Sequence, residues 1–246
     1  MQKKRRRLLY LVLAILAVAG ASLFFYFTPY EHDERARAAL ENENVTNYKD
    51  WIVFQSRQQD ALPSIIFYPG GLVKPEAYAP LALSLADKGH TTYIVKMPLH
   101  LAVLGGQKGK ALLNQFPEST FFIGGHSLGG VMASRFAADN QNSIEGVFFL
   151  ASYPDEEGSL VNANMPALSI TGSMDGVLNT EAYQAAASYL PTDASYPVIS
   201  GGNHSQFGSY GQQKGDLKAE IPPEEQTEVT AELVSDWIKK AFLQPQ

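Results

Sequence analysis

The chain of 246 residues contains no cysteine. This absence excludes disulfide bonds, thiolate metal sites, a cysteine nucleophile and a lipid anchor on cysteine. Basic residues are also scarce, with 19 Lys and Arg against 25 acids. Five of them, Lys3, Lys4, Arg5, Arg6 and Arg7, precede the first acid, so removing them takes the net charge from -6 to -11. Because nucleic acid binds clustered cations on a folded domain, we expect no nucleic-acid partner.

Long apolar runs are absent except at residues 8–27, which carry no charged side chain. At about 1.5 Å per residue, a helix of this length crosses a hydrocarbon core of about 30 Å. The cations before it and the acids Glu31 and Asp33 after it predict a single-pass cell-membrane protein with a cytoplasmic N-terminus and an extracytoplasmic domain. The alternative is a cleaved signal peptide and secretion, with a small-residue site at 17–19. The uncleaved anchor is favoured because hydrophobicity resumes at Leu23 and continues to Phe27.

The chain is long and apolar enough, at 45% hydrophobic residues, for one substantial core. We expect a basic tail and transmembrane anchor over residues 1–30, a polar spacer over 31–48 and one catalytic domain over 49–246.

Short β-rich runs alternate with helix-period segments from residue 51 onward, and several runs are apolar on both faces. This pattern predicts an α/β fold with a mostly parallel sheet of about seven to eight strands and helices on both faces. The expected strands are residues 51–54, 64–68, 91–97, 120–123, 146–151, 167–171 and 196–200. The expected helices are residues 75–88, 108–114, 128–139, 180–189 and 224–243.

A glycine-rich turn at residues 125–130 follows one apolar run and precedes a helical stretch. A nucleophile elbow requires this context, since a serine on a sharp strand-to-helix turn leaves no room for side chains two positions away on either side. Ser127 is therefore the candidate nucleophile, and Gly125 and Gly129 occupy the two crowded positions. A plain glycine-rich turn is the alternative interpretation. His126 lies inside the turn, but as a sequence neighbour of Ser127 it should point away from the hydroxyl.

A serine nucleophile needs a base, and the base needs a carboxylate that fixes its tautomer. The α/β-hydrolase order is serine, acid, histidine, with the acid and the base in loops after later strands. Asp175 follows the strand at 167–171, and His204 follows the strand at 196–200. Catalytic groups of open α/β sheets collect at these strand ends. Asp155 is the alternative acid.

Backbone N–H groups are the expected oxyanion donors. The residue after the nucleophile, Leu128, supplies one, and a loop after an early strand supplies the second. The run at residues 68–73 has that position, and its candidate donors are Gly71 and Leu72.

Residues 51–242 resemble the α/β-hydrolase superfamily through the stretches FYPGGLVKPEAYAPLA, IGGHSLGG, TGSMDG and GGNH. They look most like a small bacterial membrane-anchored group related to the dienelactone hydrolases. Those enzymes carry cysteine at the elbow, where this chain has Ser127. The resemblance implies ester-type hydrolysis by Ser127, His204 and Asp175, with no metal or organic cofactor.

The connection at residues 152–166 is too short for a large cap. We therefore expect an open site bordered by Leu72, Val73, residues 101–104 and Phe207, which takes a small-molecule or amphiphilic ester. Two other functions stay open. One is a catalytically silent binding module at the membrane surface, and the other is an acyltransferase that uses the same triad.

Overall fold

The structure, a computed structural model, describes residues 28–58, 62–163 and 165–243. The predicted membrane span at residues 8–27 lies outside these residues. Within the described ranges, no helix has the length and apolar character needed to cross a membrane.

One sheet runs through the described part of the chain, with the strand order β1-β2-β4-β3-β5-β6-β7-β8. The pairs β1–β2 and β2–β4 are antiparallel, and all other neighbours are parallel. The predicted α/β fold with a mostly parallel sheet is therefore confirmed. The strands are β1 (Val45–Asn47), β2 (Trp51–Phe54), β3 (Ser64–Tyr68), β4 (Thr92–Val95), β5 (Phe121–His126), β6 (Val147–Leu150), β7 (Ala167–Gly172) and β8 (Val198–Ile199).

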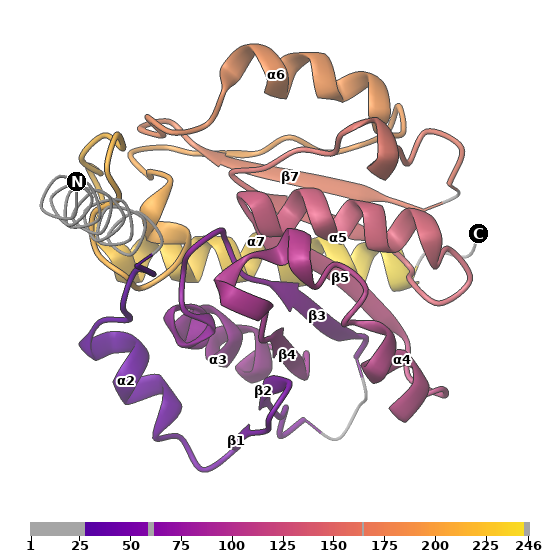
Figure 1. The fold of residues 1–246 in the computed structure, drawn as a ribbon, viewed down its shortest axis with the longest axis horizontal. Helices are drawn as coiled ribbons and strands as arrows, with labels where there is room; N and C mark the ends of the chain where they lie inside the picture. Colours follow the sequence, from indigo (N-terminus) through magenta and orange to yellow (C-terminus); the bar gives the residue numbers. More distant parts are fainter. Residues whose placement is uncertain (1–27, 59–61, 164, 244–246) are drawn as a thin grey trace, which may run out of the picture.

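Helices cover both faces of the sheet (Figure 1). The α-helices are α2 (Glu34–Leu40), α3 (Ala79–Asp87), α4 (Lys110–Gln115), α5 (Leu128–Asp139), α6 (Thr180–Ala185) and α7 (Pro223–Leu243). Short 3-10 turns are η1 (Pro75–Tyr78), η2 (Pro98–His100), η3 (Ala102–Leu104), η4 (Glu156–Gly158), η5 (Ala186–Tyr189) and η6 (Ser205–Phe207).

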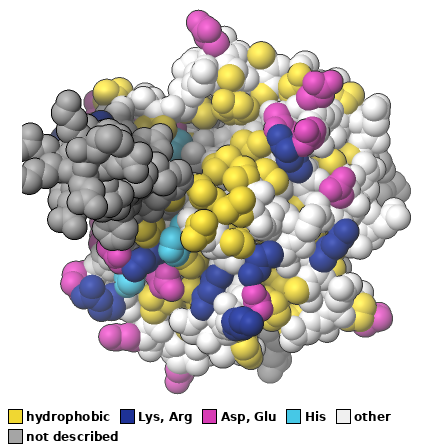
Figure 2. All heavy atoms as spheres, in the orientation of Figure 1, with side chains coloured by type: hydrophobic (Ala, Val, Ile, Leu, Met, Phe, Trp, Pro, Cys, Tyr) yellow, Lys and Arg dark blue, Asp and Glu magenta, His cyan; other side chains and the backbone are white. Residues whose placement is uncertain are grey.

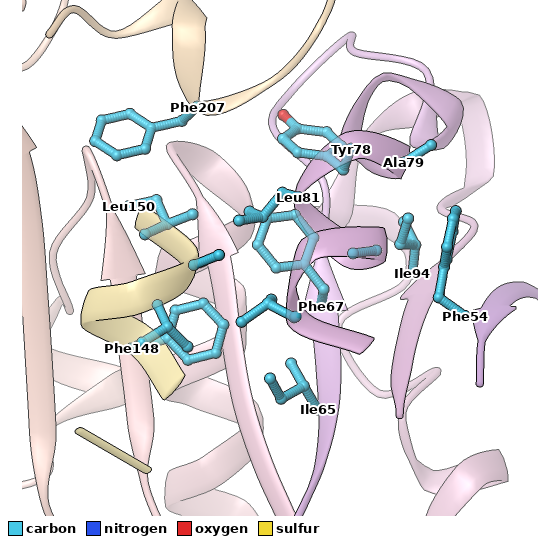
Figure 3. Close-up of a cluster of buried hydrophobic side chains, with 14 of the residues drawn as sticks. Phe54, Ile65, Phe67, Tyr78, Ala79, Leu81, Ile94, Phe148, Leu150 and Phe207 are labelled. Atoms are coloured by element: carbon cyan, nitrogen blue, oxygen red, sulfur yellow. The ribbon is translucent and has the colours of Figure 1, made fainter. Parts of the chain in front are cut away.

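Strand β3 shows why both faces are apolar. Ile65 and Phe67 belong to the core beneath α2, α3 and α7, whereas Ile66 and Tyr68 belong to the core beneath α4 and α5. Side chains alternate along a strand, so a strand covered on both sides has no position for exposed polar residues. Figure 3 shows part of the core beneath α2, α3 and α7, where Phe67 and Phe148 lie side by side between the strands and the helices.

The predicted elements are present with small differences in their ends. Strand β5 continues through Gly124 to His126, beyond the predicted end at residue 123. A Cβ on Gly124 would lie 2.4 Å from the ring of Phe148, so the glycine permits close strand packing there. The connection after β6 contains only the short turn η4 in its described part, consistent with the absence of a large cap.

Residues 31–48, predicted to be a polar spacer, are folded against the domain. Ala36 and Ala39 of α2 are buried in the core. Strand β1, which was not among the expected strands, pairs with β2. Alanines on one face of a short helix bury little surface, so the pattern gave no strong signal of packing.

Candidate active site

Ser127 occupies the sharp turn between β5 and α5. Its backbone has φ 50° and ψ −125°, a conformation that is strained for a residue with a side chain. A Cβ on Gly129 would lie 2.1 Å from the carbonyl oxygen of Tyr68, and one on Gly125 would lie 2.5 Å from the carbonyl carbon of Gly129. Neither position accepts another residue without backbone movement, which is the steric requirement of the predicted elbow.

His204 and Asp175 come together behind this turn. His204 Nδ1 and Asp175 Oδ2 are 2.9 Å apart, and the two side chains are only 2% and 4% exposed. The other carboxylate oxygen, Oδ1, accepts the backbone N–H groups of Val177 and Leu178, both at 2.8 Å. These bonds fix the carboxylate, so the imidazole that it holds has one orientation.

The second ring nitrogen of His204, Nε2, is buried and makes no hydrogen bond within the described residues. His204 and Ser127 both line a cavity of about 290 Å³. Catalytic hydrogen bonds are often long before substrate binds, so the missing contact to Ser127 Oγ does not argue against a joint role. The structure therefore brings the three predicted side chains to one place.

The walls of this cavity differ from the prediction. Val73 and Phe207, expected at its border, are each 2% exposed and belong to the core. The predicted border lay on the loops after β3 and β4 and on Phe207, which follows β8. The cavity is lined instead by residues of the elbow and of α5, by the loops after β6 and β7, and by His204. These residues are Ser127, Leu128, Val131, Ala151, Ser152, Tyr153, Val177, Leu178, Asn179 and His204.

The two candidate donors for the second oxyanion bond differ in their contacts. The Leu72 N–H donates to the carbonyl oxygen of His100 at 2.8 Å. The Gly71 N–H has no such bond among the described residues. A Cβ on Gly71 would lie 3.1 Å from Leu128 Cδ2, so this glycine lies directly against the residue that follows Ser127.

Residues 64–228 match the family described as Alpha/beta hydrolase family. The chain belongs to this family. Among curated proteins, none matches it in sequence.

Solved structures share the fold of this α/β-hydrolase at low sequence identity. Est1E from Butyrivibrio proteoclasticus has a TM-score of 0.60 and 13% identity, over 81% of this chain and 98% of that protein. A dienelactone hydrolase from Anabaena variabilis has a TM-score of 0.57 and 15% identity, over 80% and 99%. A soluble variant of monoglyceride lipase from Saccharomyces cerevisiae has a TM-score of 0.56 and 11% identity, over 81% and 95%.

Gln226 of α7 holds the loop that carries His204 in the α/β-hydrolase. Its Oε1 accepts the N–H of Asn203 at 2.9 Å, and its Nε2 donates to the carbonyl oxygen of Asn203 at 2.7 Å. Gln226 is fully buried and Asn203 is 1% exposed, so water does not compete for these groups. Sequence reasoning missed Gln226, since a glutamine on a helix normally faces solvent.

Asp216 connects the loops that carry Asp175 and His204. Its Oδ2 accepts the N–H of Ser205 at 2.8 Å, next to His204, and its Oδ1 accepts the N–H of Gly176 at 3.1 Å, next to Asp175. No motif in the sequence indicates this residue, because its partners are far away along the chain.

Tyr78 and His126 support the turn from the other side. The Tyr78 hydroxyl accepts the N–H of Gly70 at 2.9 Å and lies 2.8 Å from His126 Nδ1. Burial, and secondly the nearby His204, lowers the pKa of His126 well below 6.5, so the ring is neutral. His126 packs on His204 at a ring distance of 4.6 Å.

The alternative acid, Asp155, lies in another contact. It pairs with Arg135 of α5 and accepts the N–H of Gly158 at 3.1 Å, which caps η4. The hydrogen bonds that Arg135 donates to Asp155 raise the pKa of its guanidinium. Asp155 therefore makes a structural contact with Arg135, and Asp175 is the acid that contacts His204. Among the described residues, no cluster of three or more His, Asp or Glu could hold a metal ion.

Proposed function

We propose that this α/β-hydrolase cleaves carboxylic esters through an acyl-enzyme on Ser127. One observation carries the proposal. Asp175 accepts a hydrogen bond from Nδ1 of His204. The other ring nitrogen, Nε2, is buried and has no partner among the described residues, and His204 lines the same cavity as Ser127. A base with one nitrogen fixed and the other available is what a serine hydroxyl requires. The shared fold with an esterase and a lipase agrees with ester chemistry.

In the acylation step, Ser127 Oγ attacks the ester carbonyl carbon and its proton moves to His204 Nε2. The tetrahedral intermediate collapses with loss of the alcohol, which takes that proton. In the second half, water attacks the acyl carbon and gives its proton to Nε2. The acid leaves when Ser127 Oγ recovers the proton. Asp175 keeps the Nδ1 proton in place and stabilises the imidazolium.

The oxyanion of each tetrahedral intermediate accepts hydrogen bonds from Leu128 N–H and Gly71 N–H. Gly71 supports this role better than Leu72, whose N–H already donates to His100. One donor of this kind contributes about 10²–10³ in rate. A side chain on Gly71 would press on Leu128.

A fluorophosphonate probe tests the proposal. The wild-type protein should be labelled, and Ser127→Ala should not be. Ser152→Ala is the matched control, because Ser152 lines the same cavity and donates its hydroxyl to the Ser127 carbonyl oxygen at 2.6 Å. Equal labelling of wild type and Ser127→Ala would refute the proposal. Absence of labelling and of ester turnover in wild type would favour a silent binding module.

We also propose that residues 8–27 anchor the protein in the cell membrane, with a cytoplasmic N-terminus and the hydrolase domain outside. The charge distribution supports this orientation. We expect the protein to stay in the membrane pellet after alkaline extraction. We also expect external protease to digest it in intact spheroplasts. Release of a shortened chain into the medium would instead indicate a cleaved signal peptide.

A further inference from the structure

The first described residues of the chain are attached to the oxyanion loop. The N–H of Tyr30 donates to the carbonyl oxygen of Leu72 at 2.7 Å, and the N–H of Lys74 donates to the carbonyl oxygen of Tyr30 at 3.2 Å. Tyr30 and Val73 form a parallel bridge, and the ring of Tyr30 packs on Tyr210. Tyr30 is thus fixed within a few residues of the proposed donor Gly71.

The predicted membrane span ends at Phe27, three residues before Tyr30. Three residues of fully extended chain reach about 10 Å. An anchored protein therefore has its oxyanion loop close to the membrane surface, with no long tether in between.

An exposed hydrophobic edge adjoins this loop. Leu99, Val103 and Leu104 of η2 and η3 are 75%, 52% and 54% exposed. The edge is fixed to the oxyanion loop by the bond from Leu72 N–H to the carbonyl oxygen of His100. Turn η3 also packs against α5, the helix that Ser127 precedes. Figure 2 shows hydrophobic side chains gathered near the middle of this face, with Lys and Arg side chains beside them.

The backbone of this edge is strained. Leu99 and His100 have φ of 50° and 56°, in the left-handed region that a residue with a side chain rarely adopts. Leu99, the most exposed large hydrophobic residue described, lies in this strained turn. Strain of this kind concentrates where function requires it.

The segment that carries the edge has no acidic residue of its own in an otherwise acidic chain. Residues 96–115 contain three lysines and no acid, whereas the whole chain has a net charge of -6. Lys96 donates to neutral oxygens of Asn47 and Tyr48, and Lys108 pairs with Asp50 at 2.6 Å. A hydrophobic edge with lysines beside it fits the surface of an anionic bilayer, which attracts basic side chains close to it.

We propose that the edge formed by Leu99, Val103 and Leu104 rests on an anionic bilayer and that the substrate is an amphiphilic ester resident in that membrane. This inference rests on the proposed ester hydrolysis and on the anchor. The cavity of about 290 Å³ is just below the range of roughly 300–1,000 Å³ for ligand pockets, so it accepts one part of such an amphiphile. The anchor holds the cavity near the lipid, and the edge sets its orientation.

The test uses the full chain in vesicles of phosphatidylcholine with phosphatidylglycerol. The edge variant is Leu99→Ser/Val103→Ser/Leu104→Ser. The matched control is Val161→Ser/Phe242→Ser/Leu243→Ser, which removes three exposed hydrophobic residues elsewhere. Each protein is given a monoacylglycerol in the vesicles and, separately, water-soluble p-nitrophenyl butyrate.

We expect the rate at which the edge variant hydrolyses the vesicle ester to fall about tenfold or more. A tenfold fall corresponds to a loss of roughly 1.4 kcal/mol in interaction energy. Its rate with the soluble ester should stay near that of wild type, and the control should match wild type with both. An edge variant that cleaves the vesicle ester at the control rate overturns the inference. Wild-type protein that cleaves neither ester overturns the proposed function, and wild type that cleaves only the soluble ester overturns the inference alone.

A direct probe of contact is available because the chain has no cysteine. Leu99→Cys, labelled with an environment-sensitive fluorophore, should show a blue shift in anionic vesicles and a smaller one in phosphatidylcholine alone. Val161→Cys should show none. A shift that depends on protein concentration in detergent, without vesicles, would assign the edge to a second copy of the chain and overturn the inference.

Discussion

Gln226→Leu should destabilise the fold and slow the chemistry together. Leucine cannot replace the bonds of Gln226 to the N–H and the carbonyl oxygen of Asn203, and both residues are buried. Each backbone group left without a partner costs about 1–3 kcal/mol, so the free energy of unfolding should fall by about 2–6 kcal/mol. His204 is the next residue, and its loop loses the bonds that fix it to α7.

Urea unfolding followed by circular dichroism measures the loss of stability, and the rate of fluorophosphonate labelling measures the effect on Ser127. Gln184→Leu, at an exposed position of α6, is the control and should change the unfolding free energy by no more than about 0.5 kcal/mol. A loss below about 1 kcal/mol in Gln226→Leu, with an unchanged labelling rate, would show that Gln226 does not position the His204 loop.

Three further results are expected. Asp175→Asn should reduce ester turnover by about 10⁴-fold while the protein stays folded, because the amide holds the wrong tautomer of the histidine. Asp155→Asn, compared by the same kinetics, should keep turnover near the wild-type rate. Tyr78→Phe leaves the buried N–H of Gly70 without an acceptor, so the free energy of unfolding should fall by about 1–3 kcal/mol in urea titration. Since the pKa of His126 is lowered in the folded state, the unfolded chain binds the proton first as the pH falls. Stability measured in urea should therefore fall by up to about 1.4 kcal/mol per pH unit below about pH 6.5, and His126→Asn should flatten this slope.

The sequence predicts much of the fold because the signals are local. The apolar runs and the helical periods lie within single elements, and α5 begins and ends at the predicted residues 128 and 139. The elbow is also a local pattern, in which the crowding around Ser127 requires glycines at fixed distances. Asp175 and His204 could be found because each follows a recognisable strand in the expected order.

Contacts between distant segments could not be predicted. Gln226 and Asn203 are 23 residues apart, and nothing in either neighbourhood indicates that they meet. The choice between Gly71 and Leu72 depends on the bond from the Leu72 N–H to the loop at His100, which no sequence pattern reports. The cavity walls were misplaced for the same reason, since they depend on how the loops after β6 and β7 fold over the elbow.

The central claim, an acyl-enzyme on Ser127, is tested most directly by trapping the intermediate. Protein mixed with an activated ester is quenched with acid within the first turnover and digested, and the peptides are analysed by mass spectrometry. The account predicts one added acyl group on the peptide that contains Ser127, and no adduct in Ser127→Ala. Turnover of the ester with an adduct elsewhere, or with Ser127→Ala as active as wild type, would contradict it.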